Sequence, residues 1–186
     1  MSQLFPFVFQ NLKELMARTR ETPRNGPVDF PLHIAAQTND LEKVNQLLES
    51  GKCNVTDVWG TYSPLMLAAR HGHMGIVKRL VEAGAPLDQE NQYGTPIHLA
   101  CQEGHVDIVK FLTCIAMEAG DDDTRDIIIN AKAGENEETC LHVACQQGSL
   151  DIVKHLVEEC NANMNSKRFD GKIPLEVALN DDIIVY

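Results

Sequence analysis

The chain has 186 residues, of which 44% are hydrophobic and 5% aromatic, and its 16 basic and 27 acidic residues leave a formal net charge of −11. This length fits one domain or one continuous array of repeats. Because the negative charge opposes the phosphate backbone of nucleic acids and the anionic surface of membranes, we expect neither as a partner and favour proteins with basic surfaces.

The first 26 residues contain one short helical pattern followed by a linker. The apolar side chains spaced as one face of this helix are Val8, Leu12, Leu15 and Met16. Pro and Gly mark the linker at 22–27. No basic stretch precedes the apolar residues, and the apolar run 4–9 is short and interrupted by Pro6, so we expect neither a signal peptide nor a membrane span.

A seven-residue motif, which reads Thr-Pro-Ile-His-Leu-Ala-Cys in its third copy, returns five times in the remaining sequence. The copies occupy residues 30–36, 63–69, 95–101, 139–145 and 173–179. Their second positions are 33, 32, 44 and 34 residues apart, at Pro31, Pro64, Pro96, Cys140 and Pro174. A period in this range is the signature of stacked repeats rather than of one closed core.

Each copy predicts the start of a helix pair. Proline suits the first helical turn, and Ser63 or Thr95 before it can cap the helix. The first helix must then end for the chain to reverse, and the residues placed to adopt the left-handed conformation there are Asn39, Gly72, Gly104 and Gly148. Second helices follow, ended by Gly51, Gly84 and Asn161, and the turn-rich stretches 52–62, 85–94 and 163–172 predict hairpin loops.

The Thr-Pro-Leu-His-x-Ala motif at this period resembles the ankyrin repeat family, and matching second halves at 40–48, 72–80, 104–112 and 148–156 strengthen the resemblance. It covers about 28–186 and implies a mainly α-helical solenoid of antiparallel helix pairs with projecting β-hairpin-like loops, the fingers. About five repeats are expected, near 28–58, 59–90, 91–134, 135–167 and, incomplete, 168–186. The family also implies that His33, His98 and His142 bond backbone groups of adjacent turns. Residues 1–26 would then form a capping helix and linker, with an interaction peptide for a separate partner as the alternative.

Two irregularities interrupt the array. The insertion at 113–129 begins with a helical pattern, so we expect a longer second helix in repeat three that ends at Gly120. The acidic run that follows, within 120–126, lacks the spacing of a calcium loop and is expected to be a solvated loop, or else a site for a basic partner segment. The fifth copy stops early, which indicates either a fragment of a longer protein or an atypical cap.

The cysteines and histidines are interpreted as structural. Three of the six cysteines lie at motif positions for small apolar residues, which favours reduced core thiols and a cytoplasmic, reducing location over disulfides. The Cys/His groupings around Cys101 and Cys140 lie inside repeat positions, and the sequence shows none of the common metal-protease, P-loop or hydrolase motifs. We therefore expect no enzyme activity, no cofactor and no metal.

The family's inner surface, built from finger tips and the ends of first helices, implies the partner-binding residues. Carried over to this sequence, they are Trp59, Tyr62, Arg70, His71, Tyr93, Gln102, Glu103, Gln146, Gln147 and Phe169. Trp59, Tyr93 and Phe169 stand at comparable finger positions next to or near a glycine, where they could form an interface stripe or pack on neighbouring fingers.

The sequence is compatible with three functions. The first is a non-catalytic scaffold or adaptor that binds a protein, as a monomer. The second is the regulatory or substrate-recruiting region of a longer enzyme or channel. The third is a stand-alone inhibitor that masks a basic site on its partner.

Overall fold

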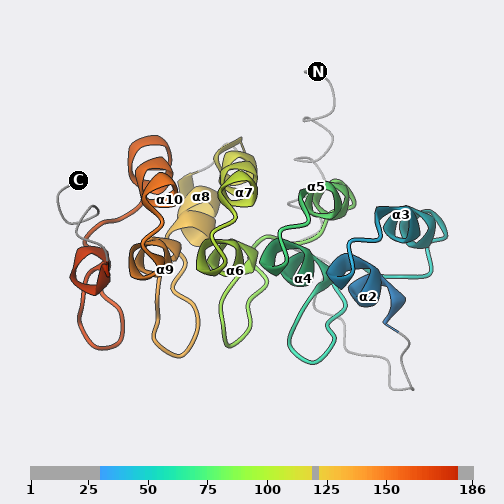
Figure 1. Ribbon diagram of the computed structural model, residues 1–186, viewed down its shortest axis with the longest axis horizontal. Helices are drawn as coiled ribbons and strands as arrows, with labels where there is room; N and C mark the ends of the chain where they lie inside the picture. Colours follow the sequence, from blue (N-terminus) through green and yellow to red (C-terminus); the bar gives the residue numbers. More distant parts are fainter. Residues whose placement is uncertain (1–29, 119–121, 180–186) are drawn as a thin grey trace. The chain divides into compact units, whose positions relative to one another are not determined.

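The computed structural model describes residues 30–118 and 122–179, so the capping helix predicted within 1–26 lies outside the described residues. The chain divides into two compact units, 1–86 and 87–186. Each unit is built from helix pairs joined by long loops (Figure 1).

Unit 1 contains two stacked helix pairs. Its helices are α2 (Pro31–Gln37), α3 (Leu41–Glu49), α4 (Pro64–Arg70) and α5 (Met74–Glu82). Helix α2 packs on α3 and α4, and α5 packs on α3 and α4, so first helices lie on first helices and second on second. Leu65, Ile76 and Leu80 are completely buried, which places the core between the two layers.

Unit 2 repeats this arrangement and adds the insertion. Its helices are α6 (Pro96–Gln102), α7 (Val106–Glu118), α8 (Asp122–Ile129), α9 (Cys140–Gln147) and α10 (Leu150–Lys154), followed by the π-helical turn η1 (His155–Glu159) and the 3-10 helix η2 (Pro174–Val177). Helix α9 packs between α6 and η2, and α7 packs against α6, α8 and α10. None of the helices described in either unit is long and apolar enough to cross a membrane.

The predicted helix ends are confirmed by the backbone. The residues predicted to end the first helices are left-handed, with φ of 61° at Asn39, 77° at Gly72, 75° at Gly104 and 71° at Gly148. Asn161, predicted to end the fourth second helix, has φ of 54°. Of the predicted caps, Ser63 accepts a hydrogen bond from the backbone N–H of Met66 at 3.3 Å.

The predicted hairpin loop 163–172 is closed by a hydrogen bond from Arg168 N–H to Lys172 O at 3.1 Å, with no antiparallel bridge among its described residues. The other three loops between repeats, which include the predicted stretches 52–62 and 85–94, are bridged hairpins. Antiparallel bridges close them at Trp59–Tyr62, Asn91–Gly94 and Ala133–Glu138. We call the loops finger one (52–62), finger two (87–94), finger three (130–138) and finger four (163–172). The third bridge encloses four residues where the first two enclose two, so finger three is the longer hairpin.

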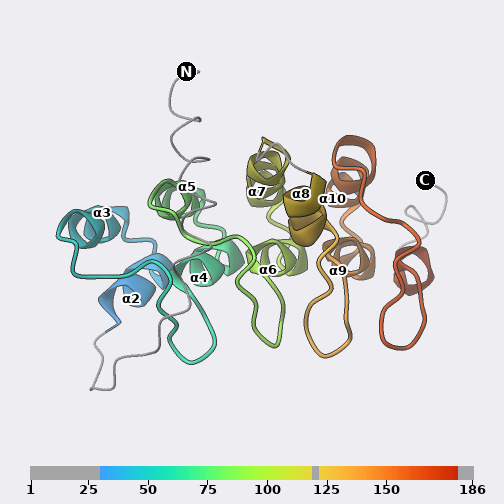
Figure 2. The same cartoon turned by 180° about the vertical axis from the view of Figure 1, so that it is seen from behind.

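The insertion is helical where the sequence favoured a loop. Helix α7 is longer than α5, as expected, whereas its predicted end at Gly120 lies outside the described residues. The acidic residues from Asp122 onward belong to α8, which begins at Asp122 and faces α7 (Figure 2). The loop prediction for this segment was therefore wrong. Ile128 and Ile129 are fully buried at the C-terminal end of α8, and this burial anchors the helix.

The second helix of repeat four contains one residue more than the second helices of repeats one and two. The interval from Gly72 to Gly84 is 12 residues, whereas Gly148 to Asn161 is 13. The closing hydrogen bond runs from Ala85 N–H to Leu80 O in repeat two but from Ala162 N–H to Leu156 O in repeat four, one residue further. The π-helical turn η1 absorbs this extra residue, because a π turn is an α turn with one residue added.

Candidate partner-binding surface

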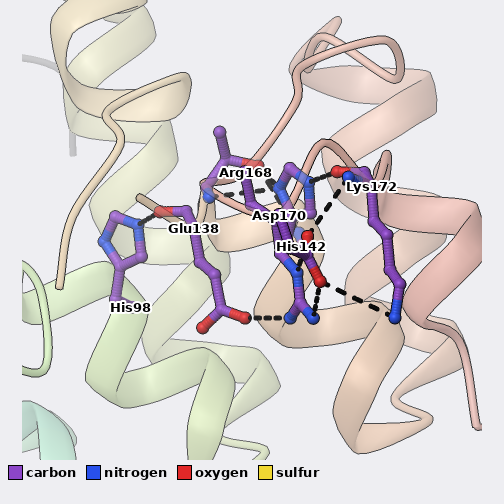
Figure 3. Close-up of polar contacts among 7 residues, drawn as sticks. His98, Glu138, His142, Arg168, Asp170 and Lys172 are labelled. Atoms are coloured by element: carbon purple, nitrogen blue, oxygen red, sulfur yellow. Dashed lines mark hydrogen bonds and ion pairs between the residues drawn. The ribbon is translucent and has the colours of Figure 1, made fainter. Parts of the chain in front are cut away.

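In repeats one, three and four, the motif histidine connects the repeat to the following finger. Nε2 of His98 donates to the backbone oxygen of Glu138 at 3.0 Å, and Nε2 of His142 donates to that of Lys172 at 3.1 Å (Figure 3). In unit 1, Nε2 of His33 donates to the backbone oxygen of Asp57 at 2.9 Å. This confirms the implied structural role, and it sets the tautomer, since a carbonyl can only accept.

The other ring nitrogen of His98 is also occupied. Nδ1 accepts from Thr95, whose hydroxyl lies 2.8 Å away. Burial lowers the pKa of His98 to about 4, because the buried site lacks the water that would solvate the charged imidazolium. Burial also lowers the pKa of His33 and His142. These imidazoles are therefore neutral hydrogen-bonding elements near neutral pH.

Fingers three and four are joined by an ion-pair cluster (Figure 3). Nη1 of Arg168 lies 2.6 Å from Oε1 of Glu138, and Nη2 of Arg168 lies 2.7 Å from Oδ2 of Asp170, with Lys172 Nζ 3.6 Å from the same oxygen. Hydrogen bonding with Asp170 raises the pKa of Arg168, and the guanidinium holds the pKa of Asp170 well below its usual range. The backbone N–H of Phe169 also donates to Asn136 O at 2.8 Å, so the two fingers are held by both side chains and backbone.

A hollow of about 440 Å³ lies between fingers two and three and the helices α6 and α9. Exposed polar side chains dominate its rim, and the floor includes the buried His98 and Ala133. The lining residues that carry amide groups are Gln92, Gln102, Asn136, Gln146 and Gln147. Its charged side chains are Glu135 and Glu138, and Tyr93 supplies an aromatic ring that is 51% exposed.

Fingers two and three approach closely beside this hollow. Gly134 has φ of 73°, and a Cβ there would lie 3.1 Å from the backbone oxygen of Gln92. The contact fixes the distance between the tips, so the hollow is formed by fingers that already contact each other.

Comparison with known proteins settles the family. The family model described as ankyrin repeats (3 copies) matches residues 32–123 and 113–185, which is most of the chain. The chain belongs to the ankyrin repeat family. Among curated relatives, the nuclear factor NF-kappa-B p105 subunit of Gallus gallus is 31% identical over 160 residues, which cover 83% of this chain but 15% of that protein. Ankyrin repeats are protein–protein interaction modules, and in general the domain is non-catalytic.

Four of the partner-binding residues implied by the ankyrin resemblance meet at the hollow. They are Tyr93, Gln102, Gln146 and Gln147. Glu103, on the same helix end as Gln102, and Phe169, whose side chain is 80% exposed, do not line it. Glu135 and Glu138 also line it. They belong to the finger tip 134–138, which the resemblance places on the inner surface, but they are not among the ten implied partner-binding residues.

The remaining implied residues lie in unit 1 and largely contact one another. Nη1 of Arg70 donates to the hydroxyl of Tyr62 at 2.8 Å, and the guanidinium carbon lies 5.7 Å from the centre of the Tyr62 ring. The His71 ring stacks on His73, with centroids 5.9 Å apart. Arg70 and Tyr62 therefore already bind each other, so the guanidinium and the aromatic ring have fewer interactions to offer a partner protein.

The finger aromatics of this ankyrin array are not structurally equivalent. Trp59 is a bridge residue of finger one, where it pairs with Tyr62, and its ring stacks on Phe30 with centroids 5.9 Å apart. Tyr93 instead lies inside the turn of finger two, between the bridge residues Asn91 and Gly94. The expectation of comparable positions was thus wrong for this pair, because each aromatic was placed by its distance to a glycine that has a different place in each hairpin.

The thiols of the ankyrin repeats are free and mostly buried. All six cysteines are unpaired, and we call Cys101, Cys140, Cys145 and Cys160 the four buried thiols. Burial raises the pKa of Cys140 to about 12 and that of Cys145 to about 11, and Cys140 Sγ donates to Ile129 O at 2.9 Å. A thiol with such a pKa is protonated at neutral pH and is a poor nucleophile.

One Cys/His pair was missed from the sequence. In the π-helical turn, Nε2 of His155 lies 3.4 Å from Cys160 Sγ and 2.8 Å from the hydroxyl of Thr113 on α7. Burial raises the pKa of Cys160, and its side chain is 2% exposed, so this contact is a packing interaction rather than an activated thiol. Within the described ranges no group of three or more His, Cys, Asp or Glu side chains is arranged to hold a metal ion.

Proposed function

We propose that this protein is a monomeric, non-catalytic scaffold or adaptor that binds a partner protein on the surface formed by the hollow in unit 2. The observation that carries the proposal is the meeting of Tyr93, Gln102, Gln146 and Gln147 at one concavity. Finger three of this concavity is held to finger four by backbone and side-chain bonds. A surface already ordered before binding loses little conformational entropy when a partner docks.

The proposed location is the reducing cytoplasm. Six free cysteines, four of them buried without a disulfide, support it, because disulfides form and persist in oxidising compartments.

Affinity capture with matched variants tests the binding surface. The immobilised wild type is compared with Tyr93→Ala/Gln146→Ala, which removes two side chains of the hollow, and with Glu82→Ala, an exposed residue of α5 outside it. The proposal expects a captured protein that binds wild type and Glu82→Ala but not the double variant. Equal capture by all three would overturn the surface assignment.

A second candidate is an inhibitor that masks a basic site on its partner. The formal net charge of −11 and the acidic side chains in the hollow favour it. An inhibitor abolishes an activity of the captured partner at saturating concentration, whereas a scaffold leaves that activity intact and holds a second protein at the same time. A regulatory region of a longer enzyme or channel is compatible with either, and the matched relative does carry the corresponding segment within a much longer chain.

A further inference from the structure

The hollow between fingers two and three has an unbalanced negative charge. Glu135 and Glu138 are its charged side chains, and the carboxylate of Glu138 already holds Arg168 at 2.6 Å. Glu135 is exposed, and among the described residues its carboxylate has neither a hydrogen-bond donor nor an ion-pair partner. His98, at the floor, is neutral, since its Nε2–H is donated to Glu138 O and its Nδ1 accepts from Thr95. One carboxylate is therefore left for a ligand.

The walls of the hollow add two further kinds of group. Tyr93 presents an aromatic ring that is 51% exposed, and an aromatic face attracts a cation placed over it. Five amide side chains line the same hollow. An amide both donates and accepts hydrogen bonds, so these groups can pair with the N–H and C=O of an extended peptide in either direction.

We infer that the hollow receives an arginine side chain carried by an extended segment of the partner protein. The guanidinium would lie between the carboxylate of Glu135 and the ring of Tyr93, and the amides of Gln102, Gln146 and Gln147 would bond the peptide backbone around it. Arginine suits this arrangement because its planar head donates to a carboxylate and stacks on an aromatic ring at the same time. A phosphorylated or acidic segment would face Glu135 and be repelled. This inference rests on the proposed binding surface and specifies what that surface recognises.

The test uses the full chain and defined peptides. NMR spectra of the 15N-labelled protein are recorded with acetyl-Gly-Gly-Arg-Gly-Gly-amide and with the same peptide carrying citrulline, which has the shape of arginine without its charge. The arginine peptide should shift the side-chain NH₂ signals of Gln102, Gln146 and Gln147, and the citrulline peptide should bind about fivefold or more weakly. Equal binding of the two peptides, or no shift at millimolar peptide, would overturn the inference.

Matched variants separate the site from general charge attraction. Glu135→Gln should weaken the arginine peptide about fivefold, whereas Glu82→Gln removes the same charge outside the hollow and should leave the affinity unchanged. Equal weakening by both would mean that the peptide senses only net charge, which contradicts the inference. If captured proteins depend on Tyr93 and Gln146 but are retained by Glu135→Gln, the binding surface stands and the arginine inference fails.

Discussion

Acid should destabilise this protein through His98, and the size of the effect follows from its environment. The folded pKa is about 4 because the ring is 1% exposed, while an unfolded histidine titrates near about 6.5. The unfolded chain therefore takes up the proton at higher pH than the folded chain. The contribution of neutral His98 to the unfolding free energy is present above about pH 6.5 and is lost as the pH falls towards 4. The loss is about 2 kcal/mol at pH 5 and roughly 3 kcal/mol in all.

A single substitution isolates this contribution. In His98→Gln the amide nitrogen can still donate to Glu138 O, but the side chain no longer titrates. Urea unfolding followed by circular dichroism, at pH 7.5 and 5.0 and constant ionic strength, should show that wild type loses about 2 kcal/mol more than the variant between these conditions. Both proteins keep His33 and His142, whose pKa values burial also lowers, so their contribution cancels in the difference.

Two results would refute this reasoning. The first is an equal loss of stability in wild type and His98→Gln. The second comes from an NMR titration of the His98 ring in the folded protein, which does not depend on two-state unfolding. A ring signal that titrates near pH 6.5 would mean that the imidazole is solvated in the folded state and that its bond to Glu138 O does not control its protonation.

Three further substitutions or probes test the fold around the site. Gly94→Ala should lower the unfolding free energy by about 2 to 4 kcal/mol, because φ is 111° and the new Cβ would lie 2.6 Å from His98 Cβ. The control Gly60→Ala, with φ of 66° and open space around it, should lower it by only about 1 kcal/mol. Equal decreases of the unfolding free energy in urea would contradict the predicted clash. Arg168→Met should speed amide hydrogen exchange in finger four without changing that in unit 1, since the guanidinium pairs with finger three at 2.6 Å; unchanged exchange in finger four would show that the backbone bond alone holds the fingers. A thiol reagent should modify the exposed Cys114 in the native protein, while the four buried thiols react only on unfolding; rapid native labelling of the buried set would show that their repeats open.

Much of the fold was predictable because its boundaries depend on residues with strong backbone preferences. Proline marks the first turn of the first helices, and residues such as Asn39 and Gly104 mark their ends through the left-handed region that the backbone confirms. The α8 helix was not predictable in this way. Its acidic start suggested solvated chain, and the burial of Ile128 and Ile129 that anchors it depends on packing that the local sequence does not show.

The sequence predicts where the site residues lie, but it does not predict which charged groups at the site are already paired. The positions of Tyr93, Gln102 and Gln146 follow from where the family puts finger tips and helix ends, and the hollow brings them together. The pairing of Glu138 with Arg168 joins residues 30 positions apart, and it decides which of the two hollow carboxylates is left without a partner. No spacing rule in the sequence reveals that division.

The π-helical turn η1 shows how the fourth repeat accommodates a change in its length. One added residue in a continuous helix would rotate everything after it by about 100°, yet Leu156 and Ala162 still close the turn as Leu80 and Ala85 do in repeat two. The extra residue is confined to a single turn, so the following finger keeps its bond to His142. A gain or loss of one codon here can therefore pass without disturbing the binding face, and an alignment that holds the repeat length fixed will misplace the residues after this turn by one position.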